Sequence, residues 1–334
     1  MRLSADEDAL AFGQSVADLY KDIADSAALR AAWDSDAGRI PGLWARLAEI
    51  GVLGAMVPED YGGLGLDLRS VLPVLVASGW NAVPEPLVET LVGSALLAAA
   101  GGSAAKQWLP AIAEGAAAVG LGLGPGQLVF GAQWADVLIL RDPVGDAHLV
   151  EPSQVTMNPA TSVDRGIRVA HVDWSPSPAT RLPDVNADDF LDVAIVGVAA
   201  QLVGLAQTML DLGVKYALQR EQFGKVIGSF QAVKHQLADV YVANSFARPV
   251  VARAAWSVAT DQPSSWRDAS HAKFAAGRAA RLSARTALQV HAGIGYTYEH
   301  DLHMYLKRTW SLTSMWGDQA WHRTRVADAV LEEE

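Results

Sequence analysis

The segment QREQFGKVIGSFQ, from Gln219 to Gln231, determines the layout of this chain because it separates two long helical patterns. Its thirteen residues include one arginine, three glutamines, two phenylalanines and two glycines. Apolar residues recur at spacings of three and four on both sides, in LDVAIVGVAAQLVGLAQTML before it and AVKHQLADVY after it, which predicts helices. A short polar turn would join two helices, so the arginine, the amides and the rings at this bend need another explanation.

The side chains of Arg220, Gln222 and Phe223 suit a dinucleotide. The guanidinium can pair with a diphosphate oxygen, and such charge-assisted hydrogen bonds contribute about 1.5–3 kcal/mol. An exposed bend with a helix-capping glutamine explains the same residues without a ligand, and both interpretations stay open on this stretch alone. A second candidate is QVHAGIGY, Gln289 to Tyr296, whose glycines let a backbone approach a flat or phosphate-bearing ligand closely.

The chain as a whole divides into three parts by the spacing of its apolar residues and by the kind of secondary structure that this spacing predicts. Residues 4 to about 118 read as helices with short breaks, and from Val119 short β-branched segments separated by Gly, Pro and Asp predict strands. Long helical patterns then return. The sequence therefore predicts a mainly α fold with a small middle β domain: an N-terminal helical domain at 1–118, a shortened β domain at 119–183 and a helical bundle at 184–334.

Composition excludes several classes of protein. The 334 residues are 51% hydrophobic and 19% charged, which supports a large core, and the net charge of −11 disfavours nucleic-acid binding. The chain has no cysteine, which excludes disulfides and thiolate chemistry and suits the cytoplasm. The N-terminus does not resemble a signal peptide. The most apolar run, Val193 to Ala206, is interrupted by Gln201 and predicts a buried core helix, not a membrane span.

Two further motifs resemble ligand-binding sites, but the residues around them favour structural roles. GLGLGPGQ, Gly120 to Gln127, looks like a phosphate-binding loop, but a β-like segment follows it where a dinucleotide fingerprint needs a helix. His300 and His303 with Glu299 could present metal ligands on one helix face, yet no further ligand accompanies them, so we expect no metal site. No Ser–His–Asp set is visible either.

Four ordered segments together resemble the acyl-CoA dehydrogenase family. PEDYGGLGL resembles its Pro-Glu-x-x-Gly-Gly-x-Gly signature, and GSAAKQWLPAIAEG resembles its Gln-x-x-x-Leu-Pro segment. REQFGKVIGSFQAVKHQLAD resembles its Arg-x-x-Phe-Gly region, and QVHAGIGYTYEH resembles its Gln-x-x-Gly-Gly-x-Gly turn. The resemblance covers nearly the whole chain. It implies a helical domain, a β-barrel-like domain and a C-terminal four-helix bundle, assembled as a dimer of dimers.

The resemblance also implies a cofactor, a reaction and partners. FAD lies at the dimer interface in this family, where the flavin accepts hydride while a glutamate removes the α-proton of an acyl-CoA thioester. Electron-transfer flavoprotein is the implied electron acceptor. By analogy, six residues would contact the FAD of a neighbouring subunit or line its diphosphate and adenosine portion: Arg220, Gln222, Phe223, Gln231, Gln289 and Gly293. Ala292 replaces the first glycine of its pair, a change that we expect to be tolerated.

The sequence departs from the family at the catalytic base. Most members carry it in a Tyr-Glu-Gly-Thr turn, which here reads SMWGDQ, with Trp316 in place of the glutamate and Asp318 in place of the threonine. Other members carry it on the first bundle helix, where counting back from Arg220 gives Ala194. An indole has a donor but no basic site, and a methyl has neither, so both positions are inert. The Thr-Glu-Pro-x-Ala-Gly-Ser-Asp segment that usually covers the flavin ring also has no counterpart.

Three hypotheses follow. The first is a partner subunit that completes the FAD site of a base-carrying paralogue, as in bacterial α₂β₂ members that act on bulky acyl-CoAs such as steroid side chains. The second is a self-sufficient homo-oligomeric acyl-CoA dehydrogenase with a relocated base, for which Glu299 and Asp192 are conceivable. The third is a flavin-free scaffold or acyl-CoA-binding protein.

Overall fold

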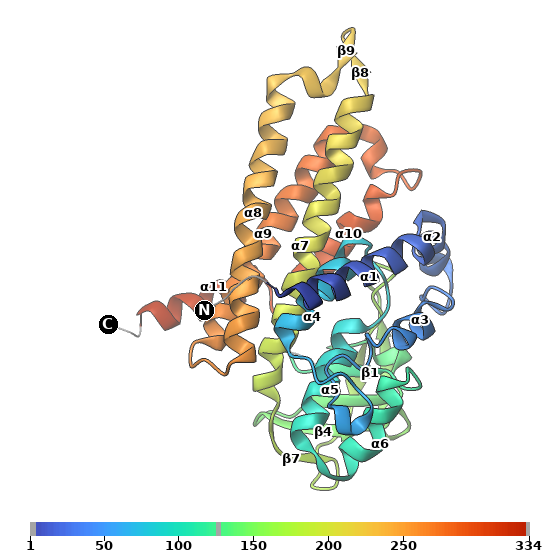
Figure 1. Cartoon of the computed structure of the whole chain (residues 1–334), viewed down its shortest axis with the longest axis vertical. Helices are drawn as coiled ribbons and strands as arrows, with labels where there is room; N and C mark the ends of the chain where they lie inside the picture. The colour runs from blue at the N-terminus through green and yellow to red at the C-terminus, as the bar shows by residue number, and fades with distance from the viewer. Residues whose placement is uncertain (1–4, 125–127, 332–334) are drawn as a thin grey trace.

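The structure, a computed structural model, describes residues 5–124 and 128–331. It has three parts: a helical N-terminal region, a β-sheet, and a bundle of long helices (Figure 1). The predicted mainly α fold with a small middle β domain is confirmed. The loop that resembled a phosphate-binding motif lies partly outside the described residues, at 125–127.

The N-terminal region contains six α-helices within the described residues. Asp6, Asp25 and Asp67 each accept a backbone N–H at the start of a helix, because a carboxylate there satisfies an amide that has no helical partner. The helices are α1 (Glu7–Ile23), α2 (Ser26–Asp34), α3 (Leu43–Glu49), α4 (Leu68–Trp80), α5 (Leu87–Ala100) and α6 (Gly102–Ala113).

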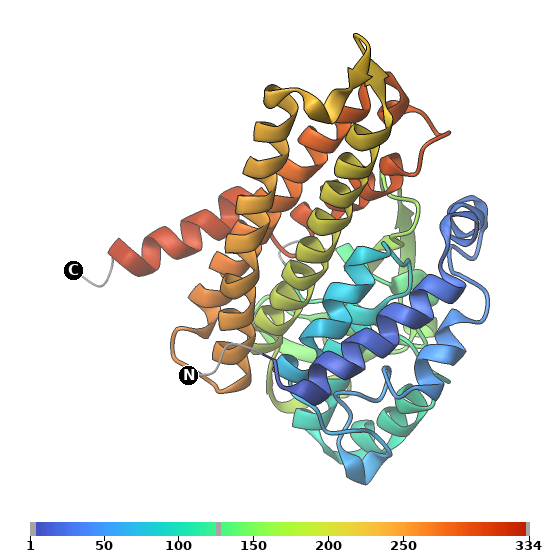
Figure 2. The ribbon, with the colours of Figure 1, turned by 45° about the horizontal axis from the view of Figure 1, so that its top comes forward.

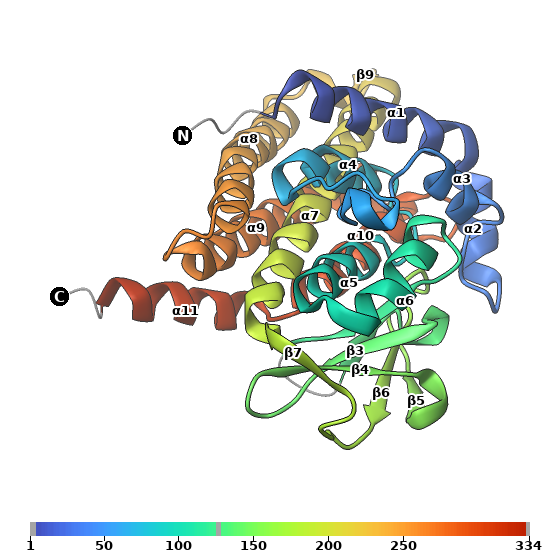
Figure 3. The same ribbon diagram turned by 60° about the horizontal axis from the view of Figure 1, so that its bottom comes forward.

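The middle region is a mixed sheet below α5 and α6 (Figure 3). Its strands lie in the order β5-β6-β2-β1-β3-β4-β7, and β1 pairs with β3 in parallel whereas the other pairs are antiparallel. The strands are β1 (Val119–Gly122), β2 (Leu128–Phe130), β3 (Val137–Arg141), β4 (Asp146–Val150), β5 (Thr156–Ala160), β6 (Val169–Asp173) and β7 (Arg181–Asn186).

The bundle begins directly after the sheet. Its long helices are α7 (Ala187–Gln219), α8 (Gln231–Ala259) and α9 (Ser265–His291), followed by α10 (Leu302–Ser314) and α11 (Gln319–Leu331). Helices α7 to α10 are the predicted four, and α11 projects away from the body (Figures 1 and 3).

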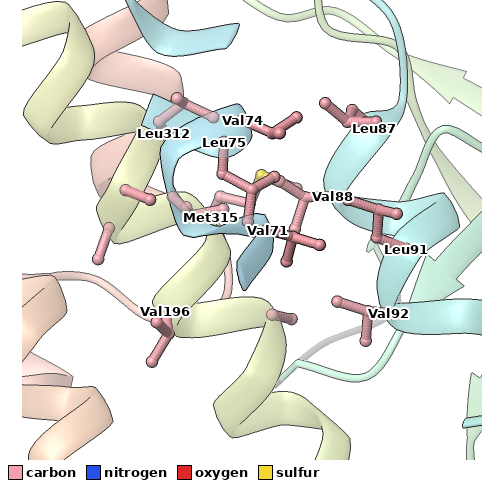
Figure 4. Packing of buried hydrophobic residues seen from close by; sticks show 14 of the residues in the cluster. Val71, Val74, Leu75, Leu87, Val88, Leu91, Val92, Val196, Leu312 and Met315 are labelled. Carbon is pink, nitrogen blue, oxygen red and sulfur yellow. The ribbon is translucent and has the colours of Figure 1, made fainter. Parts of the chain in front are cut away.

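Helix α7 is the centre of the molecule. It contacts α4, α5, α8, α9 and α10. Glycines let α4 and α7 cross closely, because a Cβ on Gly79 would lie 2.1 Å from the carbonyl oxygen of Gln201 and one on Gly204 would lie 2.2 Å from that of Val76. Apolar side chains of α4, α5 and α7 meet Leu312 and Met315 in the same core (Figure 4).

The membrane prediction needs one correction. Among the described residues, one helix, α7, is long and apolar enough by length and composition to cross a membrane, so the argument from the short run 193–206 is wrong. The expected burial is confirmed, since 83% of its apolar window is buried inside the molecule.

Candidate functional site

The bend between α7 and α8, from Gln219 to Gln231, is a short hairpin at one end of the bundle (Figure 2). Helix α7 ends at Gln219, Arg220 caps it, and β8 (Glu221–Gln222) pairs with β9 (Lys225–Val226). Phe223 and Gly224 form the turn at φ 55° and 76°. A two-residue hairpin turn favours positive φ, which glycine adopts freely but which strains a phenylalanine. The backbone therefore holds the Phe223 ring outward, 91% exposed.

The other predicted side chains of this segment are also on the surface. Arg220, Gln222 and Gln231 are exposed. The Gln222 amide donates to the carbonyl oxygen of Glu221 at 2.7 Å, and the Phe223 ring meets the Phe230 ring edge-on at 6.2 Å. An exposed guanidinium, amide and aromatic ring on one hairpin are available to a group outside this chain.

The second predicted segment lies at the same end of the bundle. Helix α9 ends at His291, and a single 3₁₀ turn, η5 (Ala292–Tyr296), follows. The buried His291 ring stacks on Tyr216 at 4.4 Å, and Tyr216 accepts the backbone N–H of Arg220. This stack joins the hairpin to the turn that carries Gln289 and Gly293, both of which are exposed.

The two positions that correspond to the family's paired glycines, Ala292 and Gly293, differ in how their backbone and surroundings constrain them. Nothing lies within 4 Å of a Cβ placed on Gly293, so packing within the chain does not require a glycine there. Ala292 has φ 53° and ψ −139°, close to a region that is essentially confined to glycine. Alanine at this position therefore carries a backbone cost of about 1–3 kcal/mol, and whether the change is tolerated in a flavin site stays a prediction.

Trp316, one of the two base positions, lies in the loop between α10 and α11. It has φ 52° and is 2% exposed. The indole meets the Phe130 ring at 5.5 Å and 70°, and a Cβ on Gly124 would lie 2.9 Å from the indole Cδ1. Its Nε1–H is buried without an acceptor. The indole fills the space between the bundle and the ends of β1 and β2.

Ala194, the other base position, is fully buried on α7. A methyl cannot accept a proton, and an indole nitrogen has no lone pair to offer. Both positions are therefore inert in the structure as in the sequence. The Asp318 carboxylate accepts the Trp321 N–H at 2.9 Å and so caps α11.

A buried lysine fixes the Trp316 turn. Lys273 on α9 is 2% exposed, and its Nζ donates to the carbonyl oxygens of Met315 at 2.8 Å and Gly317 at 3.2 Å. Burial lowers the pKa of Lys273 to about 7, against the opposing effect of Asp318. The sequence analysis missed this residue, since nothing in RDASHAKFAAG distinguishes it from a surface lysine.

The hairpin and the base positions lie far apart. Ala194 and Arg220 are 26 residues apart on the continuous helix α7, which corresponds to about 40 Å at 1.5 Å per residue. The candidate site is therefore two separate half-sites, an exposed one at the hairpin and a closed one at Trp316.

The two carboxylates considered as replacement bases have different surroundings. Glu299 is exposed in the segment after η5, at the hairpin end of the bundle. Asp192 is buried on α7, where burial raises its pKa to about 6, and its Oδ1 accepts from Arg325 at 3.2 Å. Asp192 therefore forms an ion pair that connects α7 to Arg325 on α11.

Two other carboxylates were missed by the sequence analysis. Glu85 and Glu89 line a cavity of about 20 Å³ between α5, the sheet and α10, and burial raises the pKa of each to about 7. Glu85 Oε1 accepts the Ile40 N–H at 3.0 Å, whereas its Oε2 is buried without a partner. The available signal was a pair of acids four residues apart at the start of an otherwise apolar helix.

The predicted metal-like histidines have structural roles. His303 contacts the backbone carbonyl oxygen of His300 at 2.8 Å and packs edge-on against Trp33, and His300 accepts the Leu302 N–H. Within residues 5–124 and 128–331, no group of three or more His, Cys, Asp or Glu could hold a metal ion.

Sequence comparison places the chain in a family. The acyl-CoA dehydrogenase N-terminal domain matches residues 6–116, and the acyl-CoA dehydrogenase C-terminal domain matches residues 186–331. Acyl-CoA dehydrogenase IpdE2 of Mycobacterium tuberculosis is 37% identical over 297 residues, covering 88% of each chain. IpdE2 of Mycolicibacterium smegmatis is 36% identical over 296 residues, covering 88% of this chain and 90% of that protein. The chain belongs to the acyl-CoA dehydrogenase family.

Solved structures agree with this assignment. A variant of the Tcur3481-Tcur3483 steroid ACAD superposes with a TM-score of 0.91 at 25% identity, covering 99% of both chains. The ChsE4-ChsE5 complex from Mycobacterium tuberculosis gives 0.88 at 25% identity, again over 99% of both chains. Members of the family are FAD-dependent flavoproteins and oxidoreductases that act on CH–CH bonds.

The two half-sites fit FAD unequally. At the hairpin, an exposed cation, amides and a ring match the diphosphate and the aromatic portions of the cofactor. At Trp316, the buried indole occupies the space beside the sheet, and neither base position carries a carboxylate. The first half-site fits the cofactor and the second does not.

Proposed function

We propose that this chain is a subunit of an acyl-CoA dehydrogenase with two kinds of subunit, in which it completes the FAD site of a paralogue that carries the catalytic base. Six residues would contact that FAD from outside: Arg220, Gln222, Phe223, Gln231, Gln289 and Gly293. When bound, the flavin supplies a hydride acceptor for α,β-desaturation of an acyl-CoA thioester, and electron-transfer flavoprotein would reoxidise it.

The observation that carries this proposal is the separation of about 40 Å along α7 between the hairpin and the base positions. One FAD cannot lie against Trp316 and also reach Arg220 of the same chain. The hairpin residues would therefore serve a flavin on another chain. The neighbour of this fold named the ChsE4-ChsE5 complex supports a partner for this chain, since its name gives two components.

In this arrangement the chain binds and orients the cofactor and contributes no proton transfer. The Arg220 guanidinium would pair with a diphosphate oxygen, and Gln222 and Gln289 would donate to polar atoms of the dinucleotide. The Phe223 ring would cover an aromatic face of the cofactor and exclude water from it. The acyl-CoA would lie on the paralogue. Bulky substrates such as steroid side-chain acyl-CoAs are the proposed class, in line with the steroid ACAD neighbour.

The first test is flavin content. The chain purified alone should contain little flavin, measured by visible absorbance after denaturation. Co-expression with a base-carrying paralogue should give one flavin for every two chains. One flavin per chain in the protein purified alone would overturn the proposal. Absence of flavin under both conditions would also overturn it and would support a flavin-free acyl-CoA-binding scaffold.

A second candidate is a self-sufficient enzyme with a relocated base, and the cavity under α5 favours it. The pKa of about 7 for Glu89 and Glu85 is in the range in which a carboxylate exchanges protons at neutral pH. This candidate requires flavin and dehydrogenase activity in the chain purified alone. Glu89→Gln should then abolish that activity while leaving the flavin content unchanged.

A further inference from the structure

The Trp316 indole connects the loop between α10 and α11 to the sheet, in addition to standing at a position where a base is expected. The ring packs against Phe130 at the end of β2, and its edge lies over Gly124, just beyond β1. A Cβ on Gly124 would lie 2.9 Å from the indole Cδ1 and 3.3 Å from the Trp316 Cα, so only a glycine fits beneath it. The turn between α10 and α11 is thereby fastened to the sheet.

The turn that carries the indole is held from three sides. Lys273 bonds the carbonyl oxygens on either side of Trp316, from α9. Gly317, at φ 104°, has the Trp321 ring 2.4 Å from where a Cβ would be, and His322 Nε2 lies 3.0 Å from the same point. The first turn of helix α11 therefore packs closely against the residue that follows Trp316.

The indole of Trp316 makes packing contacts and, among the described residues, no hydrogen bond through its ring nitrogen. Its Nε1–H has no acceptor although the residue is 2% exposed, and an unsatisfied buried donor costs about 1–3 kcal/mol. The ring gains apolar burial and an edge-on contact with Phe130 in return. What Trp316 contributes in this position is the volume it fills.

We propose that Trp316 is the residue that excludes flavin from this chain's own sheet-facing half-site, and so sets the number of flavins in the assembly. This inference rests on the proposed function, because the missing second flavin is meaningful only in a complex of two kinds of subunit. Opening the space at Trp316 should create the second type of site, for which the paralogue supplies the hairpin residues.

The test is the flavin content of the co-expressed complex with Trp316→Ala in this chain. The wild-type complex should hold one flavin for every two chains, and the variant should hold up to twice as much. Trp310→Ala is the matched control, because Trp310 lies on α10 and is 45% exposed. It should leave the flavin content at the wild-type value. Trp316→Phe retains a ring in the space and should also leave it unchanged.

Free indole gives a second readout on the folded Trp316→Ala complex, because it can refill the space that the substitution opens. Added to the Trp316→Ala complex, indole should refill the space and return the flavin content to the wild-type value. A folded Trp316→Ala complex that keeps the wild-type flavin content overturns the role of Trp316. That result leaves the proposed function intact, whereas a wild-type complex with one flavin per chain, or none, overturns the proposed function itself.

Discussion

The two ends of helix α7 differ in every property that matters for a cofactor. The end at Arg220 is exposed, carries a cation and amides, and stores backbone strain at Phe223 and Ala292. The end at Ala194 is buried, packed and closed by Trp316. Exposed polar groups persist at the end that is open to a ligand or partner, whereas close packing dominates at the buried end, where the Trp316 backbone is also strained at φ 52°. The comparison indicates that substitutions at the closed end should cost stability, and those at the hairpin end should cost flavin.

The largest effect is expected for the buried ion pair at the closed end. Arg308 and Asp164 are 4% and 0% exposed and are bonded to each other, and Arg308 also donates to the Val83 carbonyl oxygen at 2.7 Å. Asp164→Asn leaves the guanidinium without its counter-charge and should lower the free energy of unfolding by about 3–5 kcal/mol in urea denaturation.

The matched control is the exposed pair of Arg165 with Asp34. Asp34→Asn should change the free energy of unfolding by less than about 1 kcal/mol. Equal effects of the two substitutions would mean that the closed end is not the centre of stability.

The next effect is a pH dependence of stability from Glu85. Burial raises its pKa from 4.5 to about 7, so the folded chain holds a proton that the unfolded chain releases between these values. The contribution of Glu85 is therefore complete below pH 4.5 and is lost as the pH rises toward 7, by about 3 kcal/mol. Denaturation of wild type and Glu85→Gln from pH 5 to 8 measures it.

Glu85→Gln should show a flatter dependence of unfolding free energy on pH than the wild type. Parallel curves for the two proteins would contradict the raised pKa. The Asp192 carboxyl, whose pKa is also raised, contributes a slope of the same sign to both proteins and cancels in the difference.

Arg220→Ala should separate binding from stability at the hairpin end. Losing one charge-assisted hydrogen bond costs about 1.5–3 kcal/mol, which corresponds to flavin affinity weaker by about 10- to 100-fold in the co-expressed complex. The free energy of unfolding should not change, since the side chain is exposed. Flavin release on dilution measures the affinity. Arg46→Ala, an exposed control paired with Glu49, should leave flavin binding unchanged.

The sequence predicted the family and the order of the three parts, because both depend on ordered motifs. The two base positions, found by counting along the chain, stay a prediction. The sequence analysis missed Glu85, Glu89 and Lys273. Their burial arises where α5 meets the sheet and where α9 meets the turn after α10, contacts between segments far apart in the chain. The hairpin residues were predicted from local composition, and their exposure is consistent with that prediction. The closure by Trp316 was also missed, because it depends on the position of Gly124 and Phe130.

The smallest effect tests the strain at Ala292. Ala292→Gly should raise the free energy of unfolding by about 1 kcal/mol, because glycine adopts the backbone conformation of this position without steric cost. The same substitution at Ala194 should lower it by about 1 kcal/mol, since glycine weakens a helix interior. Thermal unfolding of both variants measures the difference, and two changes of the same sign would refute the contrast between the two ends.

The continuous helix α7 has a genetic consequence. Because the hairpin end of this chain and the inner half of the paralogue build one flavin site in the proposed assembly, a lesion in either one damages the same active site. A duplicated gene can then lose its inner half without penalty as long as its sister gene retains that half. From that point the loss of either gene abolishes the enzyme, so both genes are required together.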